Sequence, residues 1–267
     1  MKPLELIHSK DNKIIKEARK LKEKKHRIDK GEFLIEGFRF VEEALISDFE
    51  VTQIFLSEEA LEKWKSYNME DKLQSQTKFY LVSSSVLKLL SSTENPQGIA
   101  AVVKNRNIDV KDEEGFYVLM DKLQDPGNVG TIIRSAYASG ALGVLFTKGT
   151  ADIYNEKTLR STMGSIFSIP VFDDEDLTKT KLLKDKGFKL VVSSLENSKD
   201  FYEEDLRGKV IIAVGNEGSG ISEEVYSIGD VKVKIPMPGG AESLNAGAAA
   251  SVMMFEIVRQ KLTTKID

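Results

Sequence analysis

The chain has 267 residues, of which 41% are hydrophobic and 30% charged, a composition typical of a soluble globular protein with its own core. It contains no cysteine, which excludes disulfides, thiolate metal sites and a cysteine nucleophile, and its two histidines (His8 and His26) leave no good candidate for a metal site or a Ser-His-Asp triad. No apolar run is long enough to span a bilayer, and the first residues lack the apolar core of a signal peptide, so we expect a cytoplasmic protein.

The net charge of −4 argues against a globally basic nucleic-acid binder, but the charge is unevenly distributed. Residues 1–30 contain eleven Lys or Arg against five Asp or Glu, a local charge of +6. A basic segment on an otherwise acidic protein is suited to local phosphate recognition. From charge alone, a solvated lysine-rich helix explains the same residues equally well.

The first hundred residues predict a compact α/β unit. We expect helices at 11–25, 41–46, 57–64 and 84–90, and strands at 33–35, 51–56, 79–82 and 99–103. The polar, charged stretch from Lys104 to Glu114 is interpreted as a linker, so we predict one domain over residues 1–105 and a second over 106–267.

The second half alternates strands with helices. Apolar strands are expected at 116–120, 143–146, 190–192, 210–214 and 231–235, with helices at about 128–139, 155–163, 177–185, 221–227 and 243–262. This alternation predicts an α/β fold with a mostly parallel sheet covered on both faces. Because ligands bind such sheets at the carboxyl ends of the strands, three glycine-bearing loops at predicted strand ends become candidates for the site.

The first loop runs from Asp125 into a predicted helix. Pro126-Gly127 signals a turn, and Asn128 is expected to cap the helix. Arg134 follows six residues later among apolar neighbours and needs a partner. Arg134 has two interpretations. In the structural one it pairs with a local acid, Asp121 or Asp125, and in the functional one it belongs to a binding or catalytic site.

The second and third loops are rich in glycine. Residues 214–221 lack the Lys-Ser/Thr pair of a P-loop and the glycine spacing of a dinucleotide site, so their informative residue is Glu217, which lies between glycines. Residues 235–245 run directly into the small-residue helix 246–251. Gly239 and Gly240 let the backbone approach a ligand, although a tight turn before a closely packed alanine helix explains them too.

Together the three loops are far more specific than any one of them. N-V-G-T-I-I-R-S-A (128–136), G-N-E-G-S-G-I (215–221) and I-P-M-P-G-G-A-E-S-L-N-A-G-A-A-A (235–250) occur in the order and positions that resemble the SpoU/TrmH family of RNA ribose 2'-O-methyltransferases in the SPOUT superfamily. Residues 157–165, before a strand expected to end at Pro170-Val171, resemble a further family segment. The likeness covers roughly residues 116–260. The N-terminal unit is similar to the family's substrate-binding domain, which has a ribosomal-protein-like α/β fold.

The resemblance implies a fold and a cofactor. The C-terminal part of the methyltransferase domain would be threaded into a deep trefoil knot around S-adenosylmethionine (AdoMet). The residues expected to hold the adenine and ribose, mainly through backbone groups, are Gly215, Ile235 and Leu244, and those expected to line the same pocket are Met237, Gly239 and Gly240. No metal is required.

The resemblance also implies catalytic roles. Arg134 occupies the position that family members use to activate the 2'-hydroxyl, but a guanidinium pKa above about 12 makes orientation of the hydroxyl and phosphate as good an interpretation as proton abstraction. Asn128, Glu217, Ser243 and Asn245 match the other polar active-site positions. Glu217 would orient Arg134. Ser243 and Asn245 would hold the target ribose.

The implied partners are structured RNA and a second copy of the chain, joined as a homodimer through the methyltransferase domains. The cations expected to contact RNA phosphates are Lys13, Lys16, Lys20, Lys24 and Arg27. Ribosomal RNA is the favoured substrate and transfer RNA the near alternative. A catalytically silent RNA-binding protein on the same fold is a different class, and a nucleotide-binding oxidoreductase is disfavoured because the first unit lacks its fingerprint.

Overall fold

The computed structural model describes residues 6–194 and 198–263. Lys2, counted above in the basic segment, and the outer ends of both predicted domains lie outside these ranges. The chain divides into two compact units, which we call unit 1 (Met1–Asn107 with Tyr154–Leu159) and unit 2 (Ile108–Ile153 with Arg160–Asp267). Across the described ranges, no helix is both long enough and apolar enough to cross a membrane.

Unit 1 contains a four-stranded sheet with the order β1-β4-β2-β3. β4 is antiparallel to both β1 and β2, whereas β2 and β3 are parallel. The strands are β1 (Glu32–Glu36), β2 (Val51–Ser57), β3 (Lys78–Val82) and β4 (Ile99–Lys104). The four predicted strands of this half are present, with shifted ends.

The helices of unit 1 are α1 (Lys13–Lys20), α2 (Lys24–Lys30), α3 (Phe38–Ile46), α4 (Leu61–Ser66) and α5 (Ser84–Leu90), with short 3-10 turns η1 (Glu58–Ala60) and η2 (Met69–Lys72). The single helix predicted over 11–25 is wrong, because the chain breaks after Lys20. Arg27, only 6% exposed, binds the backbone where that helix would have continued. Its guanidinium donates to the carbonyl oxygens of Leu21 and Lys22 at 2.8 and 2.7 Å. These carbonyls are thereby satisfied outside a continuous helix.

Unit 2 contains a seven-stranded sheet with the order β7-β6-β5-β10-β8-β11-β9, in which every neighbouring pair is parallel. The strands are β5 (Phe116–Met120), β6 (Gly143–Phe146), β7 (Val171–Asp173), β8 (Lys189–Ser193), β9 (Lys199–Asp200), β10 (Val210–Val214) and β11 (Val231–Lys234). The central strands β5 and β10 are buried at every residue. The predicted α/β class with a parallel sheet and a smaller N-terminal domain is confirmed. The knot remains a prediction.

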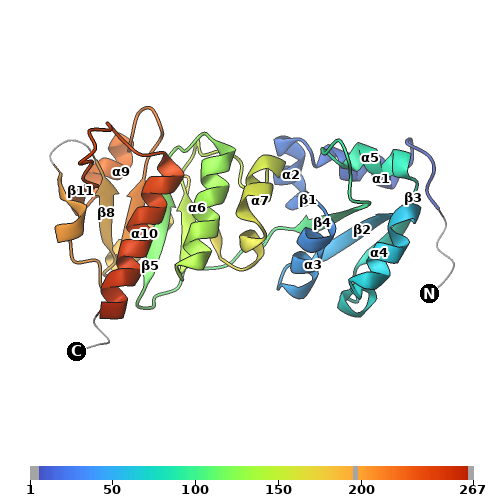
Figure 1. Ribbon diagram of the computed structural model, residues 1–267, viewed down its shortest axis with the longest axis horizontal. Helices are drawn as coiled ribbons and strands as arrows, with labels where there is room; N and C mark the ends of the chain where they lie inside the picture. Colours follow the sequence, from blue (N-terminus) through green and yellow to red (C-terminus); the bar gives the residue numbers. More distant parts are fainter. Residues whose placement is uncertain (1–5, 195–197, 264–267) are drawn as a thin grey trace. The chain divides into compact units, whose positions relative to one another are not determined.

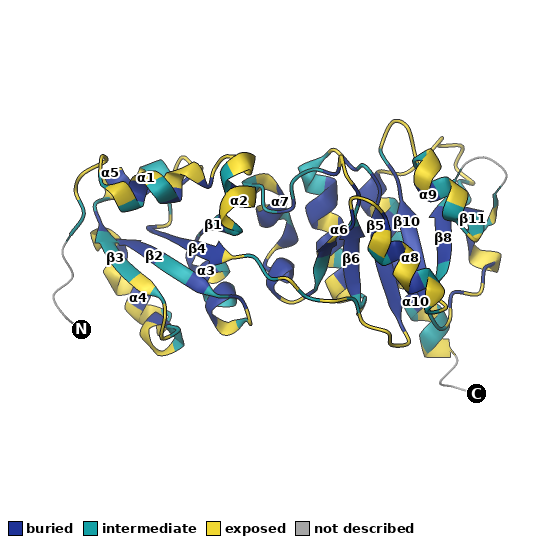
Figure 2. Cartoon of the chain, turned by 180° about the vertical axis from the view of Figure 1, so that it is seen from behind, coloured by how far each residue is buried: buried dark blue, intermediate teal, exposed yellow. Residues whose placement is uncertain are grey.

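Helices cover both faces of this sheet. They are α6 (Pro126–Ala138), α8 (Thr178–Asp185), α9 (Glu223–Ile228) and α10 (Ala246–Thr263), with 3-10 turns η3 (Ser165–Phe167) and η4 (Phe201–Glu203) nearby, whereas α7 (Glu156–Thr162) is divided between the two units. α6 and α10 lie side by side on the face seen in Figure 1, and α8 and α9 lie on the face seen in Figure 2. This two-sided cover explains why the central strands are continuous apolar runs.

Two short edge strands differ from the prediction. β7 begins at Val171, where the sequence pattern placed the end of a strand, and the preceding residues form η3 instead. The two-residue β9 was not predicted at all. Both are too short to show the apolar periodicity by which strands are recognised, and pairing with a neighbouring strand alone defines them.

Candidate active site

The first loop places Asn128 inside α6 and not at its cap. Asp125 is the N-cap, with extended backbone, and its Oδ1 accepts a 2.8 Å hydrogen bond from the Asn128 amide. Pro126 occupies the first helical position, where its fixed φ suits the helix and its missing N–H costs nothing. The predicted cap at Asn128 is therefore wrong by one turn. Because Asp125 satisfies that helix end, the Asn128 side chain, 9% exposed, is available for other contacts.

The second loop is closed by the backbone and side chain of Asn216. The Asn216 amide donates to the Gly220 carbonyl at 2.8 Å, and the Gly220 amide donates back at 2.9 Å. Asn216 Oδ1 accepts from the amides of Gly218 and Ser219 at 2.9 and 3.0 Å. Gly215 permits this closure, since a Cβ there would lie 2.3 Å from the Gly220 carbonyl carbon. The sequence analysis missed Asn216, although asparagine beside glycines is a strong turn signal.

Glu217, at the tip of the second loop, reaches back to the first. Its Oε1 accepts a 2.8 Å hydrogen bond from Asn128 Nδ2, and the amides of Gln124 and Asp125 point at its two oxygens at a longer 3.4 Å. Partial removal of the carboxylate from water would raise the pKa of Glu217. The hydrogen bonds from Asn128 and from backbone amides outweigh that effect and hold the pKa below its ordinary value.

The third loop joins the same cluster through Asn245. Its Nδ2 donates to Asn128 Oδ1 at 2.9 Å, while its own Oδ1 accepts from the amides of Gly247 and Ala248 and so caps α10. An ionised Glu217 can only accept, so Asn128 must present its NH₂ to that carboxylate and its oxygen to Asn245. One side-chain amide thus connects residues that lie 89 and 117 positions away in the sequence.

Arg134 and Ser243 are not part of this hydrogen-bonded cluster. Both are exposed, and within residues 6–194 and 198–263 neither forms a hydrogen bond or an ion pair. The expected Glu217–Arg134 contact is not formed, because Glu217 is engaged by Asn128. The two acids considered as structural partners for Arg134 are also engaged elsewhere: Asp121 with Thr147 and Ser222, and Asp125 as a helix cap.

The six residues expected at the cofactor lie at the same edge of the sheet. Gly215 directly follows β10 and Ile235 directly follows β11, and β8 alone separates these two parallel strands. Met237 is half-buried, whereas Gly239, Gly240 and Leu244 are exposed. From Pro238 to Leu244, the described structure contains one hydrogen bond, from the Gly240 amide to the Met237 carbonyl at 3.0 Å.

The five cations expected at RNA fall into three groups. Lys13 and Lys24 are exposed and, within the described part of the chain, form no ion pair. Lys16 is paired with Asp11 at 2.6 Å and Lys20 with Glu17 at 2.7 Å. Arg27 is buried in unit 1 and bound to backbone carbonyls, so its environment is that of a structural residue.

Two family models match the chain. The SpoU rRNA Methylase family matches residues 115–255, more than half of the sequence, and the MRM3-like substrate binding domain matches residues 12–101. The chain therefore belongs to the SpoU rRNA methylase family.

Individual relatives agree with this assignment over almost the whole chain. The 23S rRNA (guanosine(2553)-2'-O)-methyltransferase RlmP of Bacillus subtilis is 35% identical over 94% of this chain and 98% of its own. The 23S rRNA (uridine(2479)-2'-O)-methyltransferase of Streptomyces viridochromogenes is 31% identical over 87% of this chain and 84% of its own. Among solved structures, the SpoU methyltransferase AviRb from Streptomyces viridochromogenes, in complex with the cofactor AdoMet, is 30% identical and matches 94% of this chain and 99% of its own with a TM-score of 0.86.

Proposed function

We propose that this protein transfers the methyl group of AdoMet to a ribose 2'-hydroxyl of RNA, with ribosomal RNA as the substrate. The observation that carries the proposal is the meeting of three loops at Asn128, which donates to Glu217 and accepts from Asn245. The two relatives named above, whose sequences match this chain over 94% and 87% of its length, are 23S rRNA 2'-O-methyltransferases.

The loop residues at the sheet edge suit AdoMet chemically. The candidates carry no charged side chain and combine glycines with apolar groups, which leaves backbone N–H and C=O groups to bind an adenine ring. A Cβ at Gly239 or Gly240 would meet no atom within 4 Å, so the loop borders open space. When bound, AdoMet supplies an electrophilic methyl group on a sulfonium.

We assign Arg134 to orientation of the target ribose and its phosphate. Its guanidinium forms no ion pair with an acid among the described residues, so its fork of N–H donors is available for a phosphate oxygen. Ser243 is also unengaged and can reach the ribose. Asn245 and Glu217 are committed to Asn128, and we assign them to positioning. Holding two substrates in a reactive geometry supplies much of the acceleration in such reactions.

Ribosomal RNA is favoured over transfer RNA by the extent of the likeness. A tRNA-modifying TrmH/SpoU enzyme from A. aeolicus matches only 57% of this chain, with 27% identity and a TM-score of 0.50. The relatives named for 23S rRNA extend over unit 1 as well. Unit 1 is therefore the part that we expect to bind ribosomal RNA.

The deciding assay incubates purified protein with tritiated AdoMet and total RNA from cells that lack the gene, followed by separation of ribosomal from transfer RNA. We expect label in ribosomal RNA that is stable to alkali and maps to one 2'-O-methylated nucleotide. Label in transfer RNA alone would assign the alternative substrate. AdoMet binding without any label transfer to RNA would support a silent binding protein instead.

The phosphate contacts of unit 1 are tested by comparing free with paired lysines. Lys13→Gln and Lys24→Gln remove unpaired cations, and we expect each to reduce the slope of log affinity for RNA against log salt by about 1. Lys16→Gln is the matched control on α1, since Asp11 already neutralises it. An equal loss from all three variants would show that the unit contributes a diffuse field and no defined contacts.

A homodimer through unit 2 is the assembly that we propose. On α10, the exposed Phe255 and Leu262 (50% and 59%) are seven residues apart and thus on one face, with half-buried Val252 a turn earlier. Tyr137 on the adjacent α6 is 51% exposed. Exposed apolar side chains gathered on two packed helices are typical of a protein interface. We place the assembly in the cytoplasm, where its ribosomal substrate is made.

A further inference from the structure

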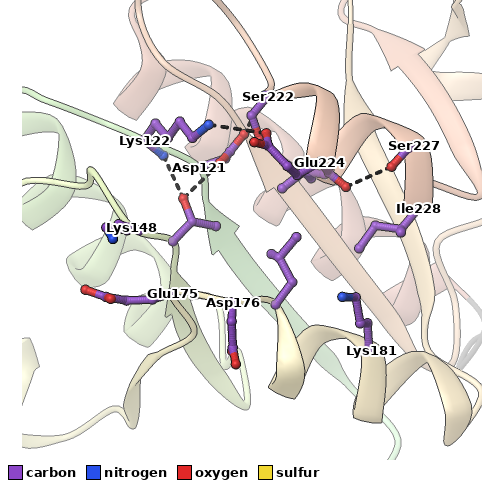
Figure 3. A pocket seen from close by; sticks show the side chains of 13 residues that line it. Asp121, Lys122, Lys148, Glu175, Asp176, Lys181, Ser222, Glu224, Ser227 and Ile228 are labelled. Carbon is purple, nitrogen blue, oxygen red and sulfur yellow. Dashed lines mark hydrogen bonds and ion pairs between the residues drawn. The ribbon is translucent and has the colours of Figure 1, made fainter.

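A buried carboxylate lies at the carboxyl end of the central strand β5, outside the three loops discussed so far. Asp121 is 0% exposed. Its Oδ1 accepts a 2.8 Å hydrogen bond from the Thr147 hydroxyl after β6, and its Oδ2 accepts a 2.6 Å hydrogen bond from the Ser222 amide at the start of α9 (Figure 3). A buried carboxylate requires such partners, and these two come from separate segments, one after β6 and one at the start of α9.

The next residue, Lys122, has a backbone that few side-chain-bearing residues adopt. Its φ of 54° lies in the left-handed region, a strained conformation that persists only where the surroundings enforce it. Two hydrogen bonds enforce it here. The Lys122 amide donates to the Thr147 hydroxyl at 3.0 Å, and its carbonyl accepts from Asn216 Nδ2 at 2.9 Å.

The Thr147 hydroxyl therefore links the carboxylate to the strained turn. A hydroxyl has one donor and two acceptor positions; its donor is used by Asp121 and one acceptor by the Lys122 amide. The group borders a cavity of about 490 Å³ whose lining includes all three residues (Figure 3). A nearly isosteric change at Thr147 thus removes both hydrogen bonds without overpacking the core.

The strained turn directs the chain into the candidate site. Three residues after Lys122, Asp125 caps α6 and so sets the position of Asn128. The intervening amide of Gln124 faces Glu217. A shift at Lys122 would therefore displace Asn128 relative to Glu217, while the second and third loops keep their own internal hydrogen bonds.

We propose that Asp121 and Thr147 are positioning residues for methyl transfer, acting through the left-handed turn at Lys122 to bring Asn128 and α6 against Glu217. The inference rests on the proposed methyltransferase function. It goes beyond that function by adding two residues outside the loops that meet at Asn128.

The principal test is Thr147→Val, which keeps the shape and removes the hydroxyl. We expect kcat to fall about tenfold, since an ångström-scale misplacement of reacting groups costs up to about a hundredfold, while the Kd for AdoMet, measured by calorimetry, changes less than about threefold. Thr147→Ser retains the hydroxyl and should stay close to wild type. Asp121→Asn should lower kcat as well, because an amide has a single acceptor oxygen for two donors.

A second-site change separates positioning from general stability. Glycine adopts φ > 0 without strain, so adding Lys122→Gly to the Thr147→Val variant should restore most of the lost kcat. A failure of glycine to restore activity, or a parallel loss of kcat and AdoMet affinity, would overturn the proposal.

Hydrogen exchange followed by mass spectrometry decides the matter independently of activity. Thr147→Val should speed exchange in peptides covering 121–128 and leave exchange in β10 unchanged. Adding Lys122→Gly should restore protection over 121–128, although the melting temperature should stay at that of Thr147→Val. Unchanged exchange over 121–128 would overturn the proposal. A wild-type protein without methyl transfer would refute the proposed function, and the exchange result would still establish or refute the anchoring of Lys122.

Discussion

At the scale of single residues, the Asn128 side chain is the one that joins the three loops of the candidate site. The oxygen and nitrogen of one amide are each bound to a different loop, and the carboxylate of Glu217 determines which way the amide faces. Arg134 is in the opposite situation, exposed and unpaired among the described residues. The hydrogen bonds of the cluster are thus made within the chain, while the Arg134 guanidinium makes none with the described residues.

Replacement of Arg134 tests its assignment as an orienting residue. We expect Arg134→Ala to lower kcat by about a hundredfold or more, and Arg134→Lys to recover only part of this, because an ammonium cannot reproduce a bidentate contact with phosphate. AdoMet affinity should stay within about threefold of wild type. Single-turnover methylation with saturating RNA measures the effect. Full activity of Arg134→Ala would remove Arg134 from the reaction.

The Glu217 carboxyl should titrate below its ordinary pKa of 4.5, because hydrogen bonds from Asn128 and backbone amides favour the ionised form. A carboxyl with a lowered folded-state pKa stabilises the protein fully above that ordinary value, and this contribution disappears as the pH falls through the lower folded-state pKa. Carbon-detected NMR titration measures the midpoint.

Asn128→Ala is the control for this titration. Partial burial of Glu217 persists in that variant while the strongest hydrogen bond is gone, so the midpoint should move upward. A midpoint that does not move on removal of Asn128 would contradict the assigned cause.

At the scale of elements, two predicted helix boundaries, the start of α6 and the continuation of α1 beyond Lys20, were wrong for one shared reason. Asn128 and the stretch 11–25 satisfied local rules for a cap and for an amphipathic helix. In the structure, Asp125 caps α6 and Arg27 takes the carbonyls that would continue α1. Local propensity is a weak prior, and a contact with a nearby polar side chain was enough to shift each boundary.

The second loop depends on Gly215. We expect Gly215→Ala to abolish measurable AdoMet binding, because its methyl group would lie 2.3 to 2.4 Å from backbone atoms of Gly220 and Ile221 and would force the loop open. Gly218→Ala in the same loop is the matched control, since the nearest atom to its Cβ would be Asn216 Oδ1 at an ordinary 3.6 Å. Calorimetric titration with AdoMet compares the two. Equal affinities would show that the loop does not close around Gly215 in solution.

At the scale of the whole molecule, the two units have different sheets and different surfaces. Unit 1 carries the exposed Lys13 and Lys24, and unit 2 carries Arg134, the hydrogen-bonded cluster and the exposed apolar residues of α6 and α10. The SpoU rRNA Methylase family model matches residues of unit 2, and the MRM3-like substrate binding domain matches unit 1.

The proposed dimer predicts that a single substitution, Phe255→Asp, lowers the mass of the assembly in solution. Phe255→Asp places a charge in the apolar surface of α10, so we expect the protein to become monomeric in size-exclusion chromatography with light scattering. Leu182→Asp is the control, because Leu182 is similarly exposed (44%) but lies on α8, on the other face of the sheet. Dissociation by both variants, or by neither, would contradict an interface on α10.

The sequence by itself determined the fold class, the order of the elements and the family. Buried strands such as β5 and β10 are apolar runs separated by helical patterns, and burial on both faces makes that signal strong. The motifs at 128–136, 215–221 and 235–250 contain Asn128, Glu217 and Asn245, which the structure brings together. Apolar runs and motifs are properties of short segments, so they can be recognised in the sequence without knowing which segments come into contact.

The tertiary structure alone decided which of those residues touch. Three findings depend on how segments pack against one another. Glu217 engages Asn128 and not Arg134, Asp125 caps α6, and Arg27 is buried. The same holds for the Asp121–Thr147 hydrogen bond beside the left-handed turn at Lys122. Hydrogen bonds select partners at about 3 Å with defined directions, and only packing of the strands in the order β6-β5-β10 brings these groups that close.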